Sequence, residues 1–145
     1  MGDNKFNFKI ITKKDKKYIY DIIRKKYILL TDEEKVRQLT IRFLIDELEI
    51  PKSQISTEKE FKIESGLKKR FDIIVFNRSG KVAMLIECKS STIKINTKVI
   101  DQILIYNKKL KAKYLLVTNG IKTLAFYCDP QNIKQINNLP KYLLL

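Results

Sequence analysis

Hydrophobic and polar positions follow one another along this chain with two spacings, one typical of helices and one typical of strands. In the first clear segment, apolar residues fall three and four positions apart, at Val36, Leu39, Phe43 (or Leu44) and Leu48. This spacing predicts a helix with one buried face. Thr31, followed three residues later by Glu34, is typical of a capped helix N-terminus, and Pro51 marks the end.

Shorter apolar runs between turn residues predict strands. Residues 69–76 (KRFDIIVF) and 81–89 (KVAMLIECK) are separated by the turn residues Asn77 to Gly80, which predicts a β-hairpin. Both runs are nearly continuous in apolar residues, so we expect them at the centre of a sheet that is covered on both faces. Residues 17–30 predict one or two further short strands, and residues 55–63 predict another.

A second helix is expected to begin at Asn96 or Thr97 and to run to about Leu110. Residues 114–120 (YLLVTNG) then predict a buried strand, which a right-handed crossover would place parallel to residues 81–89. The Asn-Gly turn at its end leads into an antiparallel strand. The remainder, through Pro140 to Leu145, is interpreted as a short helix or a tail.

The resulting element order is αβββαβ, and it predicts an α/β (α+β) fold with a central mixed sheet of four to five strands flanked by helices. A chain of 145 residues is long enough to bury one hydrophobic core. We divide it into a basic, loosely held N-terminal arm, residues 1–17, and a single domain, residues 18–145.

The formal net charge of +14 would attract a polyanion such as nucleic acid. Only five of the 30 basic residues are arginines, however, and a chain rich in lysine, isoleucine and asparagine is also what AT-rich coding produces. No apolar run approaches the roughly 20 residues of a membrane span, and the N-terminus lacks the apolar segment of a secretory signal. We therefore expect no membrane association and a cytoplasmic location. Cys88 and Cys128, without metal-site spacing, are interpreted as buried thiols.

Three residues of the predicted hairpin carry the candidate chemistry. Glu87 and Lys89 project to one face of their strand, whereas Cys88 projects to the other. Asp72 begins the partner strand, where antiparallel pairing brings it to the same end. Two adjacent carboxylates repel each other unless a hard cation such as Mg²⁺, with Mn²⁺ as a substitute, neutralises them. Such a cation would activate a water for phosphodiester hydrolysis, and Lys89 could position that water or take its proton. The alternative is that all three are ordinary residues at strand ends.

The surrounding sequence favours the first interpretation. Five segments occur in a characteristic order: TDEEKVRQ, KRFDIIVF, MLIECKS, DQILIYN and YLLVTNG. In these segments the chain resembles, over roughly residues 24–128, the N-terminal nuclease domain of type I restriction enzyme R subunits, a branch of the PD-(D/E)xK nuclease superfamily.

The resemblance implies specific roles. Asp72 and Glu87 would be metal ligands, the backbone carbonyl of Cys88 a further ligand, and Lys89 the catalytic lysine. Gln102 and Tyr106 match the QxxxY motif of the branch and lie one helical turn apart. The alternative is that Gln102 is a polar residue at the rim and Tyr106 an aromatic residue of the core. Glu34 matches an acidic position that approaches the metal through water, although helix capping explains it equally well. We also note Arg37 or Arg70 as residues that could brace these carboxylates or contact phosphate, and Glu58 or Glu60 as further charge.

The leading hypothesis is therefore a Mg²⁺-dependent DNA endonuclease of a restriction-modification system, acting on DNA as a homodimer or with partner subunits. No phosphate-binding loop is present among the four glycines, so the chain carries no motor of its own. It is either a standalone protein or a fragment of a larger one. A catalytically inactive nucleic-acid-binding module or partner subunit is the second hypothesis, and an interaction protein whose lysines reflect composition alone is the third.

Overall fold

A computed structural model describes residues 6–64 and 66–145 and contains two sheets and two α-helices. A three-stranded antiparallel sheet comes first, formed by β1 (Ile10–Lys13), β2 (Lys16–Asp21) and β3 (Lys26–Leu29). Helix α1 (Asp32–Asp46) follows. The second sheet has the strand order β4-β5-β6-β7-β8-β9. Its elements are β4 (Ile55–Glu64), β5 (Leu67–Phe76), β6 (Val82–Cys88), helix α2 (Thr97–Leu110), β7 (Tyr114–Thr118), β8 (Thr123–Cys128) and β9 (Ile133–Ile136).

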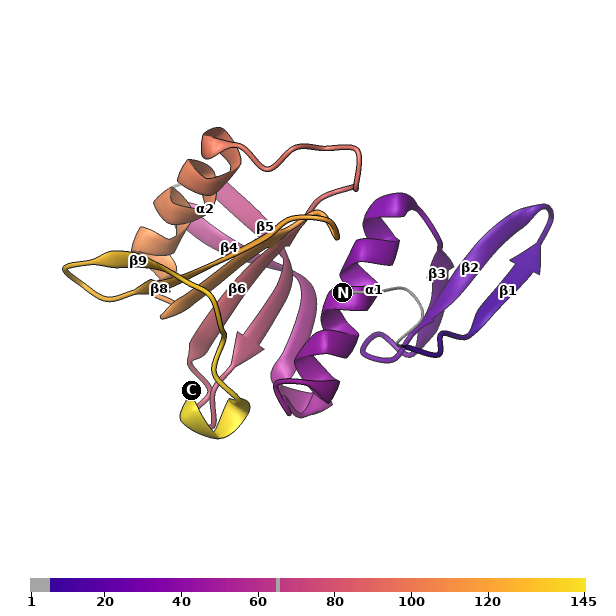
Figure 1. Ribbon diagram of the computed structural model, residues 1–145, viewed down its shortest axis with the longest axis horizontal. Coiled ribbons are helices and arrows are strands. Elements are labelled where there is room, and N and C mark those ends of the chain that lie inside the picture. Colours follow the sequence, from indigo (N-terminus) through magenta and orange to yellow (C-terminus); the bar gives the residue numbers. More distant parts are fainter. Residues whose placement is uncertain (1–5, 65) are drawn as a thin grey trace.

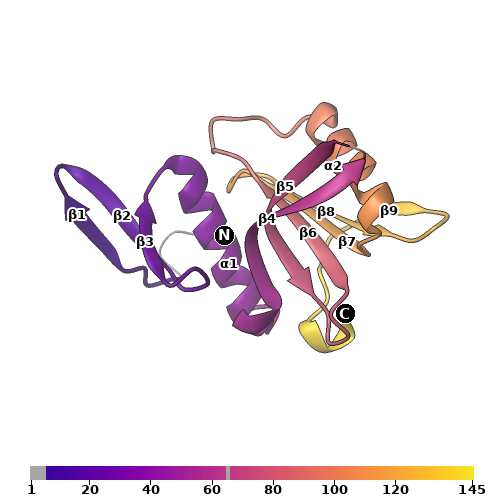
Figure 2. The same ribbon diagram turned by 180° about the vertical axis from the view of Figure 1, so that it is seen from behind.

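The two helices cover opposite faces of the six-stranded sheet (Figures 1 and 2). Strand β6 shows the division clearly, because Met84 and Ile86 pack on the side of α1 whereas Leu85 packs on the side of α2. All three side chains are fully buried. The prediction of a central strand covered on both faces is therefore confirmed.

The predicted helix caps are formed by side chains of the expected residues. Thr31 Oγ1 accepts a hydrogen bond from the Glu34 amide at 3.0 Å, and Asn96 Oδ1 accepts one from the Val99 amide at 3.1 Å. Helix α1 ends at Asp46, some residues before Pro51. The side-chain oxygens of Thr31 and Asn96 satisfy amides of the first helical turn, which have no partner within the helix.

The elements α1, β4, β5, β6, α2 and β7 follow one another as expected, with β5 and β6 antiparallel, β7 parallel to β6 and β8 antiparallel to β7. The sheet has six strands, however, not four to five. The additional strand is β9, in the segment interpreted as a helix or tail. Its sequence IKQI has little alternation, and backbone pairing with β8 holds it at the sheet edge.

The prediction of a loosely held arm is wrong for residues 10–17, which form β1 and the start of β2. Lys13 pairs with Lys16, so the turn consists of Lys14 and Asp15 alone. Both have positive φ angles, 50° and 63°, as a tight hairpin turn requires. The sequence hides this turn because it contains no glycine or asparagine. Residues 1–5 of the predicted arm lie outside the described residues.

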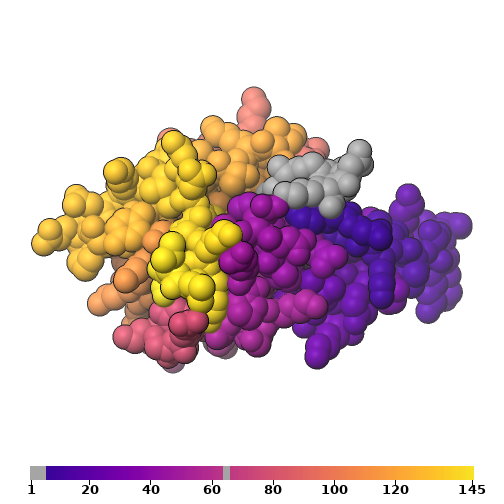
Figure 3. Space-filling model, turned by 60° about the horizontal axis from the view of Figure 1, so that its bottom comes forward, coloured from indigo at the N-terminus to yellow at the C-terminus, as the bar shows by residue number. Residues whose placement is uncertain are grey.

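The small sheet lies at one end of the molecule, with α1 between it and the larger sheet, and the C-terminal segments gather toward the other end (Figures 1 and 3). Of the two cysteines, both free, Cys88 is buried as predicted, but Cys128 is only half-buried. No helix among the described residues is long and apolar enough to cross a membrane.

Candidate active site

Strand β6 and helix α2 bring four of the predicted site residues together. Glu87, Lys89, Gln102 and Tyr106 line one cavity of about 10 Å³, roughly the volume that a single water molecule needs. Lys89 follows the last residue of β6 and continues the pairing with β7 through its amide, so Glu87 and Lys89 point to the same side. The helical period places Gln102 and Tyr106 one turn apart. Lys69 of β5, which the sequence analysis did not single out, completes the polar lining.

Glu87 is a buried carboxylate without a full set of partners. It is 7% exposed, and its Oε1 atom has no hydrogen bond among the described residues. Lys69 Nζ lies 3.3 Å from this oxygen as an ion pair whose angles are not those of a hydrogen bond. Burial first, and then the negative charge of Asp72, raise the pKa of Glu87 to about 7, against the opposing effect of Lys69 and Lys89.

Asp72 lies at the point where β5 separates from β6. The ladder between the two strands ends at the pair Ile73 and Ile86. The next free amide of β6, that of Cys88, donates a hydrogen bond to Asp72 Oδ2 at 2.8 Å instead of to a backbone carbonyl of β5. The other oxygen, Oδ1, accepts a hydrogen bond from Arg37 Nη2 of α1, also at 2.8 Å.

Asp72 and Glu87 are thus close in the sheet but have different surroundings. Asp72 is held by a residue of α1, whereas Glu87 lines the cavity beneath α2, which Asp72 does not line. Their charges still interact, because Asp72 contributes to the raised pKa of Glu87. The sequence predicted that Asp72 begins its strand and meets Glu87 at one end of the hairpin. Asp72 instead lies in the middle of β5, and the two residues lie directly beyond the last β5–β6 pair, Ile73 and Ile86.

Glu34 takes part in a buried ionic network and does not cap its own helix. Its carboxylate forms ion pairs with Arg37 and with Arg24, the latter at 2.5 Å, and Gln38 Nε2 donates to it at 3.0 Å. Only 5% of the side chain is exposed. Arg37 therefore bridges Glu34 and Asp72 directly. Burial lowers the pKa of Arg37, but the hydrogen bond with Asp72 and the charges of both carboxylates outweigh it and raise that pKa.

Arg24, in the β2–β3 turn, extends the network to two further elements, β2 and β4. Its Nε atom lies 2.6 Å from Asp21 of β2, and its Nη1 atom lies 3.3 Å from Glu58 of β4. Asp21 is fully buried, and bonds from Arg24 lower its pKa despite the opposing effect of burial. The network contains more carboxylates than guanidinium groups, which leaves an excess of negative charge beside Asp72.

Cys88 contributes through its backbone. Its thiol is buried against Thr40, with 3.8 Å between Sγ and Oγ1, and burial raises its pKa well above the usual value. A thiol of this kind is a poor nucleophile and a poor metal ligand. The expected metal ligand is the backbone carbonyl of Cys88, and that role stays a prediction.

Several residues that contact the candidate site were not predicted from the sequence. Lys69 is one of three consecutive basic residues in β5, and nothing in the sequence shows which of them turns inward. Its Nζ atom lies 5.2 Å from the centre of the Tyr106 ring as well as beside Glu87. Asp21, Arg24 and Gln38 were missed because their partners are distant in the chain or lie across element boundaries. Of the residues noted only as possible braces, Arg37 and Glu58 join the network.

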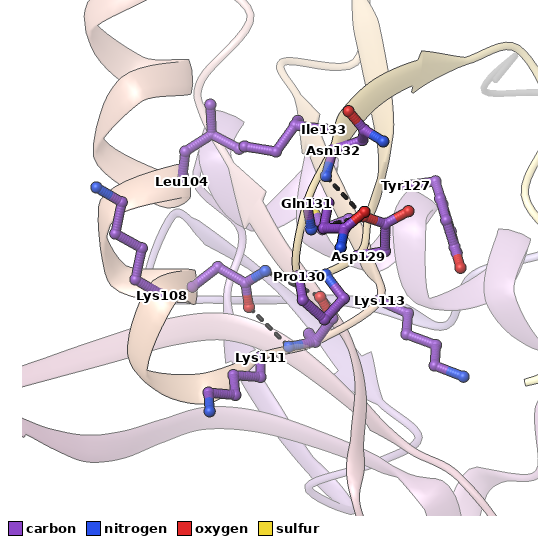
Figure 4. A pocket seen from close by; sticks show the side chains of 13 residues that line it. Leu104, Lys108, Lys111, Lys113, Tyr127, Asp129, Pro130, Gln131, Asn132 and Ile133 are labelled. Atoms are coloured by element: carbon purple, nitrogen blue, oxygen red, sulfur yellow. Dashed lines mark hydrogen bonds between the residues drawn. The ribbon is translucent and has the colours of Figure 1, made fainter.

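The larger cavity of the molecule is elsewhere. A pocket of about 760 Å³ lies between the C-terminal half of α2 and the loop joining β8 to β9 (Figure 4). The side chains of Lys108, Lys111 and Lys113 extend away from it, and the carboxylate of Asp129 is occupied by turn amides (Figure 4). This pocket has none of the paired carboxylates that the predicted chemistry requires.

The fit of a divalent cation to the site rests on Glu87. A buried carboxylate oxygen without a hydrogen bond, next to a second carboxylate, is a suitable ligand for a hard cation. Against this, both oxygens of Asp72 already have partners, and the described residues hold no group of three or more acidic, cysteine or histidine side chains placed to bind a metal. The residues fit a cation held by few side chains and completed by backbone and water oxygens.

The family model described as "Type I restriction enzyme R protein N terminus (HSDR_N)" matches residues 32–140. No curated protein matches the chain. Among solved structures, the fold is similar to that of a fragment of an HsdR subunit of a type I restriction enzyme from Vibrio vulnificus YJ016, with a TM-score of 0.56 and 18% sequence identity. The match covers 77% of this chain but only 24% of that one, so the present chain spans about a quarter of its relative.

Proposed function

The chain belongs to the family of type I restriction enzyme R protein N termini, and from this premise we propose that it is a Mg²⁺-dependent DNA endonuclease with an active site of the PD-(D/E)xK kind. The proposed residues are Asp72, Glu87, Lys89, Gln102 and Tyr106, with the backbone carbonyl of Cys88. Mn²⁺ is expected to substitute for Mg²⁺, and Glu34 to approach the metal through water.

One observation carries this proposal. A buried glutamate with an oxygen free of hydrogen bonds shares a water-sized cavity with Lys89, the residue that directly follows strand β6. Burying a carboxylate costs free energy unless each of its oxygens has a hydrogen-bond partner or a bound ligand. Buried ionisable groups with perturbed pKa values occur mainly at functional sites. The carboxylate of Asp72 lies close enough to influence its protonation.

In the proposed mechanism each side chain has a distinct task. Asp72, Glu87 and the Cys88 carbonyl would hold the cation, which when bound supplies an activated water and stabilises negative charge on the scissile phosphate. Lys89 positions the attacking water or takes its proton. Gln102 and Tyr106, on the facing side of α2, orient the water and the DNA backbone.

Arg37 and Lys69 act as positioning residues. Arg37 fixes the direction of the Asp72 carboxylate through the 2.8 Å hydrogen bond, and Lys69 lowers the pKa of Glu87 and so favours its ionised form. Ionised carboxylates are the form that binds a divalent cation. Both basic residues would also offset the excess negative charge before a cation arrives.

The experiment is a plasmid-nicking assay with purified protein in Mg²⁺ and in Mn²⁺. We expect the wild type to convert supercoiled DNA to the nicked form, and the folded variant Lys89→Ala to lose this activity by about 100-fold or more. Lys122→Ala, which removes an exposed lysine in the β7–β8 turn, is the matched control and should cleave normally. Equal cleavage by wild type and Lys89→Ala would refute the proposal.

DNA and other subunits of a restriction system are the proposed partners. A single active site cuts one strand at a time, so a double-strand break would require a homodimer or two successive events. The motor that moves DNA in such systems would have to come from outside the described residues.

A second function is favoured by the hydrogen bonds of Asp72, because both of its carboxylate oxygens already accept one from the protein. The site could therefore be a catalytically inactive remnant in a nucleic-acid-binding module or partner subunit. Such a protein would bind DNA with a steep dependence on salt and would cleave in neither metal. The nicking assay and a binding titration together distinguish the two functions.

A further inference from the structure

The three-stranded sheet has an outer face with an unusual composition. The pairing of Ile11 with Tyr18, and of Tyr18 with Leu29, places these residues on one side of the sheet, because opposed residues of antiparallel strands share a face. Alternation along the strands adds the remaining members. We call this the tyrosine face; its residues are Lys9, Ile11, Lys13, Lys16, Tyr18, Tyr20, Tyr27 and Leu29.

The tyrosine face points to solvent. The opposite, inner face points to the protein only in part, because its Ile10 in β1 is 48% exposed. Ile19 and Asp21 of β2, on the inner face, are fully buried. On the tyrosine face, Tyr27 and Leu29 are each 42% exposed and Ile11 is 40% exposed. The solvent-facing side of a sheet is usually polar, and apolar or aromatic side chains exposed there contribute little to folding. Their grouping on this face therefore calls for another explanation.

The rings are arranged as neighbours, and the charge around them has one sign. Tyr20 and Tyr27 stand 5.2 Å apart, centre to centre, in an edge-to-face contact. Lys9 Nζ lies 5.8 Å from the Tyr20 ring. Lys13 and Lys16 extend the same face toward the hairpin tip. Within β1, β2 and β3 the tyrosine face carries no acidic residue.

The sheet also lies outside the part of the chain that defines the family. The family match begins at residue 32, after β3 has ended. Figures 1 and 2 show the β1–β2 hairpin projecting from the body of the molecule beyond α1. It lies outside the residues that match the family model, and its outer face is remote from the cavity of Glu87.

We propose that the tyrosine face binds single-stranded nucleic acid, with unpaired bases stacked on the tyrosine rings and phosphates close to the lysines. Exposed aromatic side chains on a sheet, bordered by basic residues, provide the two interactions that bind unpaired strands without sequence preference. A duplex hides the faces of its bases and would use only the lysines. A protein partner of ordinary composition would not require a face of purely positive charge.

The test is a fluorescence-anisotropy titration of the whole chain with labelled oligo(dT) of about 12 nucleotides, in EDTA. We expect binding, with quenching of tyrosine fluorescence, which is readable because the chain has no tryptophan. Tyr27→Leu should weaken binding about fivefold or more. Lys13→Gln with Lys16→Gln should reduce the slope of log affinity against log salt by about 1.4.

Matched variants on the other sheet separate this site from general attraction. Tyr127→Leu of β8 and the pair Lys122→Gln with Lys134→Gln should leave the affinity for oligo(dT) nearly unchanged. A duplex of the same length should bind more weakly than the single strand and should not respond to Tyr27→Leu. Because cleavage is absent in EDTA, failure of the endonuclease proposal would not alter these results.

Three outcomes would overturn the inference. These are the absence of oligo(dT) binding, equal effects of the two lysine pairs together with no effect of Tyr27→Leu, and a homodimer in sedimentation that Tyr27→Leu dissociates. The last would identify a second copy of the chain as the occupant of the face. Circular dichroism of each variant establishes that the exposed substitutions leave the fold intact.

Discussion

Arg37 of α1 donates a hydrogen bond to Asp72 of β5, with 2.8 Å between Nη2 and Oδ1, and so joins the first helix to the predicted metal ligand. The same guanidinium pairs with Glu34, one turn earlier in its own helix. It is 6% exposed, so its charge is compensated almost entirely within the protein.

Arg37→Ala should destabilise the fold by about 3 to 5 kcal/mol, because it leaves the buried Glu34 and the half-buried Asp72 without their shared cation. Urea unfolding measures the free-energy change. Arg78→Ala, in the exposed turn between β5 and β6, is the control and should stay within about 0.5 kcal/mol of the wild type. An Arg37→Ala variant as stable as that control would mean that the ionic network does not contribute to folding.

The raised pKa of Glu87 predicts a stability that depends on pH. The folded state holds this proton more tightly than the unfolded chain, so the stabilising contribution is complete below the usual pKa of 4.5 and is lost as the pH rises through about 7. The loss across this window is roughly 3 kcal/mol. Urea unfolding of the wild type and of Glu87→Gln at several pH values should give curves that diverge in this window. Parallel curves would contradict the prediction.

A divalent cation should reverse that loss. At pH 8, Mn²⁺ or Mg²⁺ at about 100 times its dissociation constant should raise the melting temperature of the wild type by about 5 °C or more. Glu87→Gln, which removes a charged ligand, should show a much smaller shift. Differential scanning calorimetry provides this readout without reference to cleavage, and equal shifts in both proteins would exclude Glu87 as a ligand.

Lys69 and Lys68 offer a matched pair for testing the electrostatics of the cavity. Lys69 lies 3.3 Å from Glu87, whereas the neighbouring Lys68 is 65% exposed and contacts Glu60 at 4.0 Å. Lys69→Met should raise the pKa of Glu87 further, since it removes a nearby positive charge. Lys68→Met should leave that pKa in place. Carbon-detected NMR titration of the glutamate carboxyls compares the two directly, and identical titrations would disprove the assignment.

Gly120 and Gly80 form a second matched pair. Both have positive φ angles, 86° and 79°, but only at Gly120 would an added Cβ meet a side chain, Val36 Cγ2 at 3.2 Å. Gly80→Ala should therefore cost only the backbone strain of about 1 kcal/mol. Gly120→Ala should cost about 1 kcal/mol more, because α1 must shift away from the β7–β8 turn. Thermal unfolding of the two variants measures the difference, which should vanish if the contact is unimportant.

The sequence predicted those parts of the fold that local signals encode. The hairpin of β5 and β6 has turn residues and apolar strands, and the helices have caps at Thr31 and Asn96. The β1–β2 turn and strand β9 were missed because neither carries such a signal. The β1–β2 turn lies within a run of lysines that contains no typical turn residue pair. Strand β9 is defined only by its backbone pairing with β8.

The candidate site was likewise predictable only where local sequence signals define it. Glu87 and Lys89 share a face because strands have a period of two, and Tyr106 meets them because α2 crosses above that face. The partners of Asp72 were not predictable. They depend on where β5 separates from β6 and on which turn of α1 lies opposite, and both are properties of the tertiary packing. The catalytic roles of these residues stay predictions.

Arg24 has a consequence for how the molecule should be divided. This one side chain, in a turn that precedes the family match, neutralises carboxylates on β2, α1 and β4. A protein cut at the limit of sequence similarity would keep Glu34 and Glu58 but lose one of the two arginines that pair with both, leaving Arg37 alone. The limit of the family match at residue 32 therefore does not coincide with a structural boundary, because the small sheet and its turn contribute Asp21 and Arg24 to the ionic network beside Asp72.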